Sequence, residues 1–149
     1  MFSQTVEYAL RAMVQLAADA PSASTTREIA AKTKVPSAYL AKVLQSMRRA
    51  GLIHSRRGVG GGVTLAMPPK EVSLLDVIDA VEPLQRARGK SRNAASPLQR
   101  TLDAALGQMR ETFDNVSLSD MLAPKKGKTA ARRKSAKSPP RKRARTSAK

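Results

Sequence analysis

The sequence predicts a mainly α-helical fold that carries one small two-stranded β-hairpin. Apolar residues recur at helical spacing in several segments, and cap residues or prolines stand at the ends of those segments. One stretch, around residues 52–66, instead combines short strand-like runs with a cluster of glycines. With 149 residues, of which 41% are hydrophobic, the chain has enough apolar material for one small core.

The boundaries of the first two helices follow from periodicity and from cap residues. A first helix is expected over residues 4–18, with Ser3 as its N-cap and a loop that begins at Pro21. Its apolar stripe consists of Val6, Leu10, Met13 and Ala17. Thr25 and Glu28 have the spacing of a capping box, which predicts a short second helix through about residue 33.

A third helix follows closely enough to form a helix-turn-helix with the second. Ser37 is expected to cap a helix over residues 38–50, and Gly51 is expected to end it. Ala30 is the small residue that lets two helices approach closely, whereas Lys34 lies where a glycine often makes the turn. The residues expected where the two helices pack are Ile29, Val35, Leu40 and Val43. An ordinary helical hairpin is the alternative interpretation.

The segment after the third helix predicts two strands around a glycine-rich turn. The strands are Leu52–Arg56 and Val63–Ala66, and the proline pair that follows ends the second strand. Ser73 is then expected to cap a fourth helix through Glu82. The buried side of that helix is expected to consist of Leu74, Leu75, Ile78 and Val81. A helix-turn-helix followed by a hairpin is the layout of a winged helix-turn-helix, whose usual ligand is duplex DNA.

The chain divides into four predicted regions. Residues 1–82 form the winged-helix domain, and residues 83–96, rich in arginine, lysine and small side chains, form a linker. Residues 97–122 contain a long helix, about 97–115, because Pro97 is well tolerated at a first helical position. The apolar stripe of this helix is Leu98, Leu102, Ala105, Leu106, Met109 and Phe113. Residues 123–149 are expected to be a disordered basic tail, because they have almost no apolar side chain to bury.

The charge balance favours a polyanionic partner. The chain has 28 basic and 11 acidic residues, a formal net charge of +17. Residues 125–149 contain 12 lysines and arginines and no acid, which leaves a net charge of +5 for the rest. Nucleic acid is the first candidate and an anionic membrane surface the second. No apolar run approaches the ~20 residues that span a bilayer. We therefore expect a soluble intracellular protein.

Candidate DNA-binding residues lie on the third helix and on the hairpin. A recognition helix presents its N-terminal residues to base edges in the major groove, and arginines in a hairpin can reach phosphates or a minor groove. The candidates are Ser37, Ala38, Tyr39, Lys42, Arg48, Arg49, Arg56, Arg57, Gly58 and Gly60. A nucleotide-binding loop is disfavoured, because Val63 stands where the dinucleotide fingerprint needs its third glycine and a strand follows. A plain flexible turn is the other alternative.

Several motifs along residues 1–122 carry a family resemblance. They are Tyr8-Ala9-Leu10-Arg11-Ala12, Glu28-Ile29-Ala30, Tyr39-Leu40-x-Lys42-Val43-Leu44, Ala50-Gly51-Leu52-Ile53, residues 55–62 and residues 73–78. In order and spacing this set resembles the Rrf-two (Rrf2) family of bacterial winged-helix transcription regulators, which includes regulators of iron–sulfur assembly, of the nitric-oxide response and of cysteine metabolism. The resemblance implies a homodimer that pairs its long C-terminal helices, so the stripe on residues 97–115 is assigned to dimerisation. Packing inside the same chain is the alternative. The resemblance also places Tyr39, Arg57 and Gly58 at positions where the family contacts DNA.

Two departures from the family pattern limit what can be carried over. Cluster-binding members hold iron and sulfur through three cysteines in the segment that matches residues 83–102, and this chain has no cysteine at all. Glu7 lies near the position of an acidic ligand in some members, but one carboxylate without thiolates is not a cluster site. We therefore expect no iron–sulfur cluster, no metal ion and no other cofactor. Ala41 stands where at least one member reads a base with a glutamate, so the operator sequence is not inherited from that member.

The predicted function is that of a homodimeric, sequence-specific DNA-binding transcription regulator, with repression as the expected direction and a palindromic operator as its partner. The alternative is an architectural nucleoid protein that binds DNA non-specifically through hairpin and tail. No enzyme is expected: His54 and the carboxylates Asp76, Asp79 and Glu82 are explained by packing, capping and solvation. An effector, whether a small molecule or a partner protein, is left open.

Overall fold

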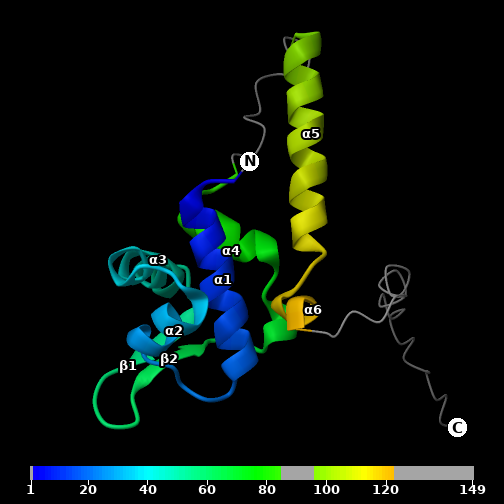
Figure 1. Ribbon diagram of the computed structural model, residues 1–149. Helices are drawn as coiled ribbons and strands as arrows, with labels where there is room; N and C mark the ends of the chain where they lie inside the picture. Colours follow the sequence, from blue (N-terminus) through cyan, green and yellow to red (C-terminus); the bar gives the residue numbers. More distant parts are fainter. Residues whose placement is uncertain (1, 85–95, 123–149) are drawn as a thin grey trace, which may run out of the picture.

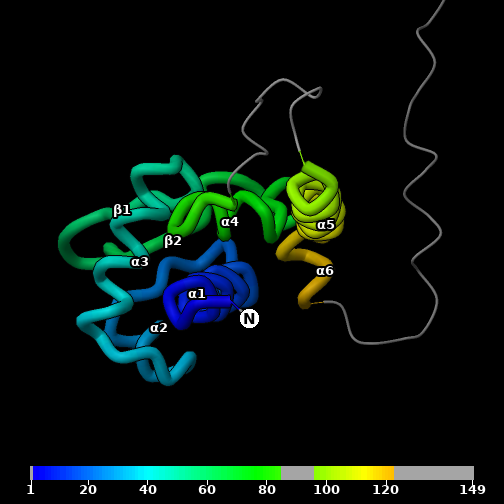
Figure 2. Tube along the Cα trace, turned by 90° about the horizontal axis from the view of Figure 1, so that it is seen from above, coloured from blue at the N-terminus to red at the C-terminus, as the bar shows by residue number. Residues whose placement is uncertain are grey.

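The computed structural model describes residues 2–84 and 96–122. Its elements are α1 (Gln4–Asp19), α2 (Thr26–Thr33), α3 (Ser37–Arg49), β1 (Ile53–Arg56), β2 (Gly62–Leu65), the 3₁₀ helix η1 (Pro69–Glu71), α4 (Leu74–Val81), α5 (Pro97–Asp114) and α6 (Leu118–Leu122). Helices α1 to α4 and the hairpin form one body, and α5 projects away from it (Figures 1 and 2). The predicted fold class, mainly helical with a two-stranded antiparallel sheet, is confirmed. The predicted basic tail and most of the predicted linker lie outside the described residues.

Side-chain caps fix the starts of α1, α2, α4 and α5. Ser3, Thr25, Ser73 and Ser96 each accept a hydrogen bond from the backbone N–H three residues further on. At Thr25 and Ser73 the acidic residue at the third helical position also accepts a bond from the cap's own N–H, which completes a capping box. Each cap stabilises its helix by about 1 kcal/mol. The predicted caps Ser3, Thr25 and Ser73 are confirmed.

The start of α3 differs from the prediction. Ser37 is the first helical residue and not the N-cap, which is Pro36, and no side chain caps this helix. The carbonyl of Pro36 accepts the first helical bond from the N–H of Leu40 at 3.0 Å. A proline can stand at this position because a cap residue needs its carbonyl and not an N–H. The prediction of Ser37 as cap was therefore wrong by one residue.

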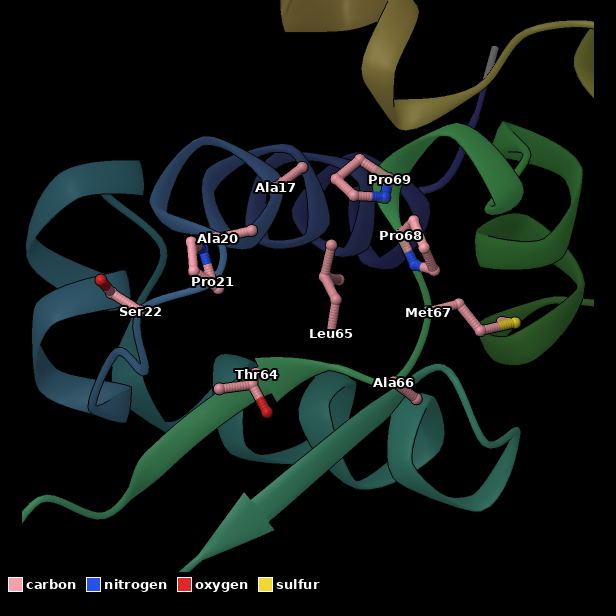
Figure 3. Close-up of a pocket in the computed structure, with 10 residues that line it drawn as sticks. All are labelled: Ala17, Ala20, Pro21, Ser22, Thr64, Leu65, Ala66, Met67, Pro68 and Pro69. Atoms are coloured by element: carbon pink, nitrogen blue, oxygen red, sulfur yellow. The ribbon is translucent and has the colours of Figure 1, made fainter.

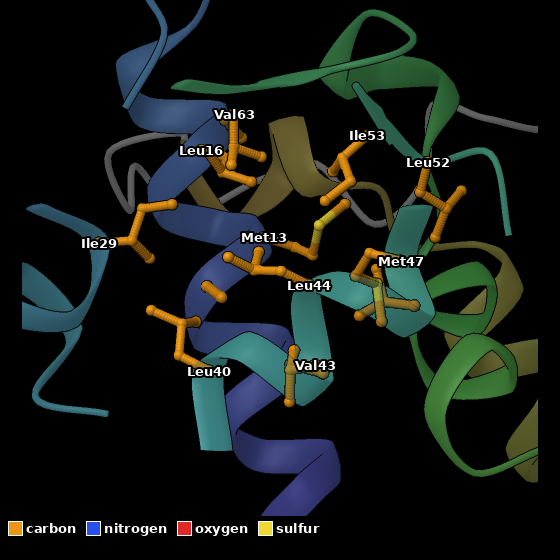
Figure 4. Close-up of a cluster of buried hydrophobic side chains, with 14 of the residues drawn as sticks. Met13, Leu16, Ile29, Leu40, Val43, Leu44, Met47, Leu52, Ile53 and Val63 are labelled. Carbon is orange, nitrogen blue, oxygen red and sulfur yellow. The ribbon is translucent and has the colours of Figure 1, made fainter. Parts of the chain in front are cut away.

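The core lies where α1 crosses the helix-turn-helix (Figure 4). Met13 and Leu16 of α1 are almost fully buried against side chains of α2, α3 and the hairpin. The residues predicted to pack between α2 and α3, namely Ile29, Val35, Leu40 and Val43, are all buried, as predicted. These contacts hold the two helices in a helix-turn-helix arrangement.

Helix α4 buries a somewhat different face from the predicted one. Its buried residues are Leu75, Val77 and Ile78, whereas Leu74 and Val81 are only half-buried. The cause is that α4 packs against α1, α3 and α5, so its buried arc is wider and differently centred than a single stripe. Val77 lies inside that arc although the prediction omitted it.

The hairpin is anchored to the loop between α1 and α2. Its register pairs Ile53 with Leu65 and Arg56 with Gly62. Ser24 exchanges two backbone hydrogen bonds with Val63, at 3.0 and 2.8 Å, and so forms an isolated antiparallel β-bridge beside the two strands. These bonds fix β2 on the body close to the turn, while the turn itself extends into solvent (Figure 1).

Helix α5 stands out because it buries none of its residues within the described part of the chain. Its C-terminal end is joined to the body by backbone bonds: Leu74 donates to the carbonyl of Val116 at 2.8 Å, and Leu118 donates to that of Val72 at 2.9 Å. Leu118 in α6 is fully buried. None of the described helices is long and apolar enough to cross a bilayer.

Candidate nucleic-acid interface

One face of α3 is committed to the core and the opposite face is open to solvent. The buried face consists of Leu40, Val43, Leu44 and Met47. On the opposite face, steps of four, three and four residues align Ala38, Lys42, Gln45 and Arg49, which are all exposed. Gln45 was not among the predicted DNA-binding residues. Its spacing from Lys42 and Arg49 is the sequence signal that would have found it.

The predicted DNA-binding residues lie on one side of the molecule. Every one of them, on α3 and in the hairpin, is exposed. Helix α3 and the hairpin both lie on the side of the body opposite α5 (Figures 1 and 2). The stripe assigned to dimerisation is therefore well separated from the candidate DNA-binding residues.

Tyr39 is held in place by a small network with α1. Its side chain is 51% exposed, and its ring packs edge-on against the ring of Tyr8, with centroids 5.8 Å apart. The side-chain amide of Gln4 donates to the hydroxyl of Tyr8 at 2.7 Å. This network restrains the Tyr39 ring before any ligand arrives, which lowers the entropy cost of a contact made by that ring.

A cleft separates α3 from the hairpin. It has a volume of about 260 Å³, and its polar lining comprises Thr26, Gln45, Arg48 and Ser55, with Ala41 among its apolar residues. A guanidinium, hydroxyl groups and an amide supply N–H and O–H groups that can donate hydrogen bonds to phosphate oxygens. The cleft thus brings together one predicted residue, Arg48, with polar groups from α2 and the hairpin that the sequence did not single out.

The turn of the hairpin depends on glycine. Gly58 and Gly60 have φ angles of 97° and 74°, a region that other residues adopt only with strain. The N–H of Gly61 donates to the carbonyl of Gly58 at 2.9 Å and closes the turn. Val59 is fully exposed at its tip. Arg57 therefore stands at the entrance to a turn with little bulk, where a nucleic-acid backbone could approach closely.

The arginines of α3 and of the hairpin are not neutralised by carboxylates. Within residues 2–84 and 96–122 the ion pairs are Lys32 with Asp19 and Arg110 with Asp79, and neither includes a residue of α3 or the hairpin. The exposed cations of this surface are consequently available to phosphates, whose binding releases counterions.

Most of the apolar stripe of α5 is not covered by the described residues of its own chain. Leu98, Leu102 and Met109 are 68%, 56% and 41% exposed. Ala105 is exposed, Leu106 is half-buried, and the half-buried Phe113 packs edge-on against Phe2 with ring centroids 5.3 Å apart. The alternative of an intramolecular core face therefore gains no support from this part of the chain.

A separate cavity of about 610 Å³ lies between the end of α1 and the end of β2 (Figure 3). Leu65 stands at its centre, and Pro21, Met67 and Pro68 are among the residues around it. Its lining contains no ionisable side chain and only the hydroxyls of Ser22 and Thr64. It supplies no proton donor or acceptor of the kind that acid–base catalysis uses.

The comparisons with known proteins identify the family. Residues 2–124 match the family model "Rrf2: Iron-dependent Transcriptional regulator". A Rhodobacter capsulatus protein named as an rrf2-like HTH-type transcriptional regulator is 32% identical, covering 83% of this chain and 93% of its own length. Among solved structures, T. potens IscR superposes with a TM-score of 0.71 at 27% identity, over 82% of this chain and 85% of its own. CymR, the global cysteine regulator of B. subtilis, gives 0.69 at 25% identity, over 81% and 95%.

The description of the family as iron-dependent can be tested against the donor groups of this chain. The sequence contains no cysteine, so no thiolate is present to hold an iron–sulfur cluster. The described residues include no group of three or more histidines, aspartates or glutamates that could hold a metal ion, and residues 85–95 contain none of these types. The residues present do not fit such a cluster. By the match over residues 2–124 and the similarity to the rrf2-like regulator, this chain belongs to the Rrf2 family of DNA-binding transcriptional regulators.

Proposed function

We propose that this protein is a repressor that binds a palindromic operator as a homodimer and does so without an iron–sulfur cluster. The observation that carries the proposal is the separation of two surfaces: exposed, unpaired cations on α3 and the hairpin, and an uncovered apolar stripe on α5. Repression is the direction we propose, because a dimer seated on DNA obstructs the binding of other proteins to the same site.

Dimerisation through α5 accounts for the exposed stripe. Large apolar side chains at helical spacing on a projecting helix are stabilised when a second copy covers them. A two-fold axis between the helices would relate the two copies of α3, so the operator would have the same symmetry. Half-sites would then lie about one helical turn of DNA, or a multiple of it, apart.

In the proposed complex, some residues of the DNA-binding surface would contact base edges and others would contact phosphates. Ala38, Lys42 and Gln45 lie on the open face of α3, where a glutamine can pair with adenine and a lysine with guanine. Arg48 in the cleft and Arg57 at the hairpin turn would bind phosphates or enter a minor groove. Tyr39, braced by Tyr8, would contact the backbone or a base beside them.

The regulatory signal in this proposal does not pass through iron–sulfur chemistry. A small molecule or a partner protein would act as the effector instead. We also propose that the protein works in the bacterial cytoplasm on the nucleoid, and that it has no enzymatic activity of its own.

Selection from random duplexes tests the proposal. The full-length chain should enrich one palindromic sequence, and Arg57→Ala and Tyr39→Ala should each weaken its binding by about tenfold. Arg100→Ala is the matched control, since Arg100 is exposed on α5, away from this surface. If Arg57→Ala and Tyr39→Ala both bind as the unaltered chain does, the assigned DNA-binding surface is wrong.

An architectural DNA-binding protein is the second candidate, and the charge of residues 125–149 favours it. Twelve basic residues without an acid can bind any duplex by counterion release. Under this alternative, the selection would enrich no sequence with either the full chain or residues 1–124. A defined palindrome from both would exclude it.

A further inference from the structure

The direction in which α5 leaves the body depends on few contacts. Its C-terminal end is joined by the backbone bonds of Val116 and Leu118, and none of its eighteen residues is buried. Apolar packing therefore does little to hold the helix at a set angle. The half-buried Phe113, which packs on Phe2, is one further attachment, and a polar cluster more than one turn before that end is another.

This cluster is centred on Arg110 of α5 and Asp79 of α4. The two nitrogens of the guanidinium donate to the two carboxylate oxygens, at 3.2 and 3.0 Å, in a bidentate pair. The same guanidinium donates to the carbonyl of Leu84, whose own N–H donates to Asp79 at 3.0 Å. The side chains of Arg110 and Asp79 are only 18% and 33% exposed.

The bidentate geometry makes this ion pair directional. Two parallel charge-assisted bonds fix the orientation of the guanidinium plane as well as its distance from the carboxylate. The third bond, to Leu84, ties the same group to the chain that leaves α4. Nearby, Phe2 packs on Phe113 and Ser3 hydrogen-bonds Glu82, so the start of α1 meets the same junction.

We propose that Arg110 is a positioning residue that sets the angle of α5 to the DNA-binding body and thereby selects the spacing of the operator half-sites. The inference rests on the proposed homodimer. In such a dimer, the angle of each α5 determines how far apart the two copies of α3 lie. A helix of 18 residues is about 27 Å long, so a tilt of about 10° moves its far end by about 5 Å. That displacement exceeds the rise of about 3.4 Å per base pair.

Binding to operators of altered spacing tests this role. The probe is the palindrome recovered by selection, with its centre shortened or lengthened by one or two base pairs, titrated with the full chain. The unaltered protein should prefer one spacing clearly. Arg110→Ala should lose about tenfold in affinity at that spacing and much less at the others, so its profile flattens. Arg110→Lys, which cannot form the bidentate pair, should give an intermediate profile.

The controls separate positioning from general damage. Arg100→Ala, on the same helix and outside both described ion pairs, should keep the profile of the unaltered chain. The exchange Asp79→Arg with Arg110→Asp should restore the spacing preference in part. Dimer mass and thermal unfolding are measured for every variant, and Arg110→Lys replaces Arg110→Ala as the deciding variant if the latter does not fold.

The outcomes distinguish this inference from the function on which it rests. An unchanged profile in the deciding variant, or an equal loss at every spacing, would overturn the role of Arg110 and leave the palindromic operator standing. An unaltered protein without any preferred spacing would contradict both the symmetric homodimer and the role of Arg110.

Discussion

At the scale of single residues, Lys34 has a strained backbone conformation in the turn of the helix-turn-helix. It has φ 57° and ψ 30°, the left-handed conformation that glycine adopts without strain. We expect Lys34→Gly to raise the free energy of unfolding by about 0.5 kcal/mol, because relief of the strained backbone outweighs the extra freedom of the unfolded chain. The midpoint of urea unfolding at constant m-value measures it.

Lys34→Ala is the control for that prediction. It removes the charged side chain and keeps the β-carbon, so the backbone strain stays and no gain in stability is expected. Equal stabilisation by alanine and glycine would show that the lysine side chain, and not its backbone conformation, is the source of the effect.

At the scale of elements, Asp19 joins α1, α2 and the loop between them. Its carboxylate accepts from Lys32 at 3.0 and 3.1 Å, from Ser24 at 2.8 Å and from Gln15 at 3.1 Å. The bond from Lys32, followed by that from Ser24, lowers the pKa of Asp19 below its ordinary value. Because Ser24 also pairs with Val63, this carboxylate supports strand β2 of the hairpin.

The lowered pKa of Asp19 gives its contribution a pH dependence of known sign. The ionised form is favoured in the folded state, so the stabilisation is present above about pH 4 and is lost as the pH falls through the lowered pKa. We expect Asp19→Asn to cost about 0.5 kcal/mol at pH 7, a modest value because Lys32 is half exposed to solvent. Urea unfolding at pH 7 and pH 3 measures the difference, which should shrink at the lower pH. A difference that is the same at both would contradict the ion pair as its source.

At the scale of the whole molecule, we expect the charge of residues 125–149 and the shape of the folded body to make separable contributions to DNA binding. Deletion of residues 125–149 removes 12 of the 28 basic residues. We expect the deletion to weaken binding to every duplex and to make the slope of log K against log salt shallower by about 0.9 for each phosphate that the tail would otherwise neutralise. The preferred sequence should not change, because in the proposed complex α3 and the hairpin, and not the tail, contact the base edges. Fluorescence titrations from 50 to 200 mM salt, with operator and scrambled duplexes, measure both quantities. A shift in the preferred sequence would show that the tail takes part in recognition.

Much of the fold could be predicted because its signals are local. The capping boxes at Thr25 and Ser73 and the proline at position 97 specify where helices begin, and each depends on residues a few positions apart. The buried residues of α3 follow from spacing alone. The same reasoning was wrong at the start of α3. Pro36 and Ser37 are neighbours that are both compatible with the N-cap position, and in the structure the N-cap is Pro36.

The candidate site was predicted in part for the same reason. The exposed face of α3 and the arginines before the hairpin turn follow from periodicity and from charge. Gln45 and the cleft around Arg48 were missed, because a cleft forms only when segments distant in sequence come together. The brace of Tyr39 by Tyr8 was missed because it links residues of α1 and α3.

The sequence by itself determined the helical class, the hairpin, the cationic character and the absence of thiolates, since these depend on composition and on short-range spacing. Only the tertiary structure decided which cations are left unpaired, which face α4 buries and how α5 is attached. Arg110 and Asp79 are 31 positions apart, and no local pattern marks them as partners. Their pairing is a consequence of how α4 and α5 pack, and packing depends on the whole folded chain.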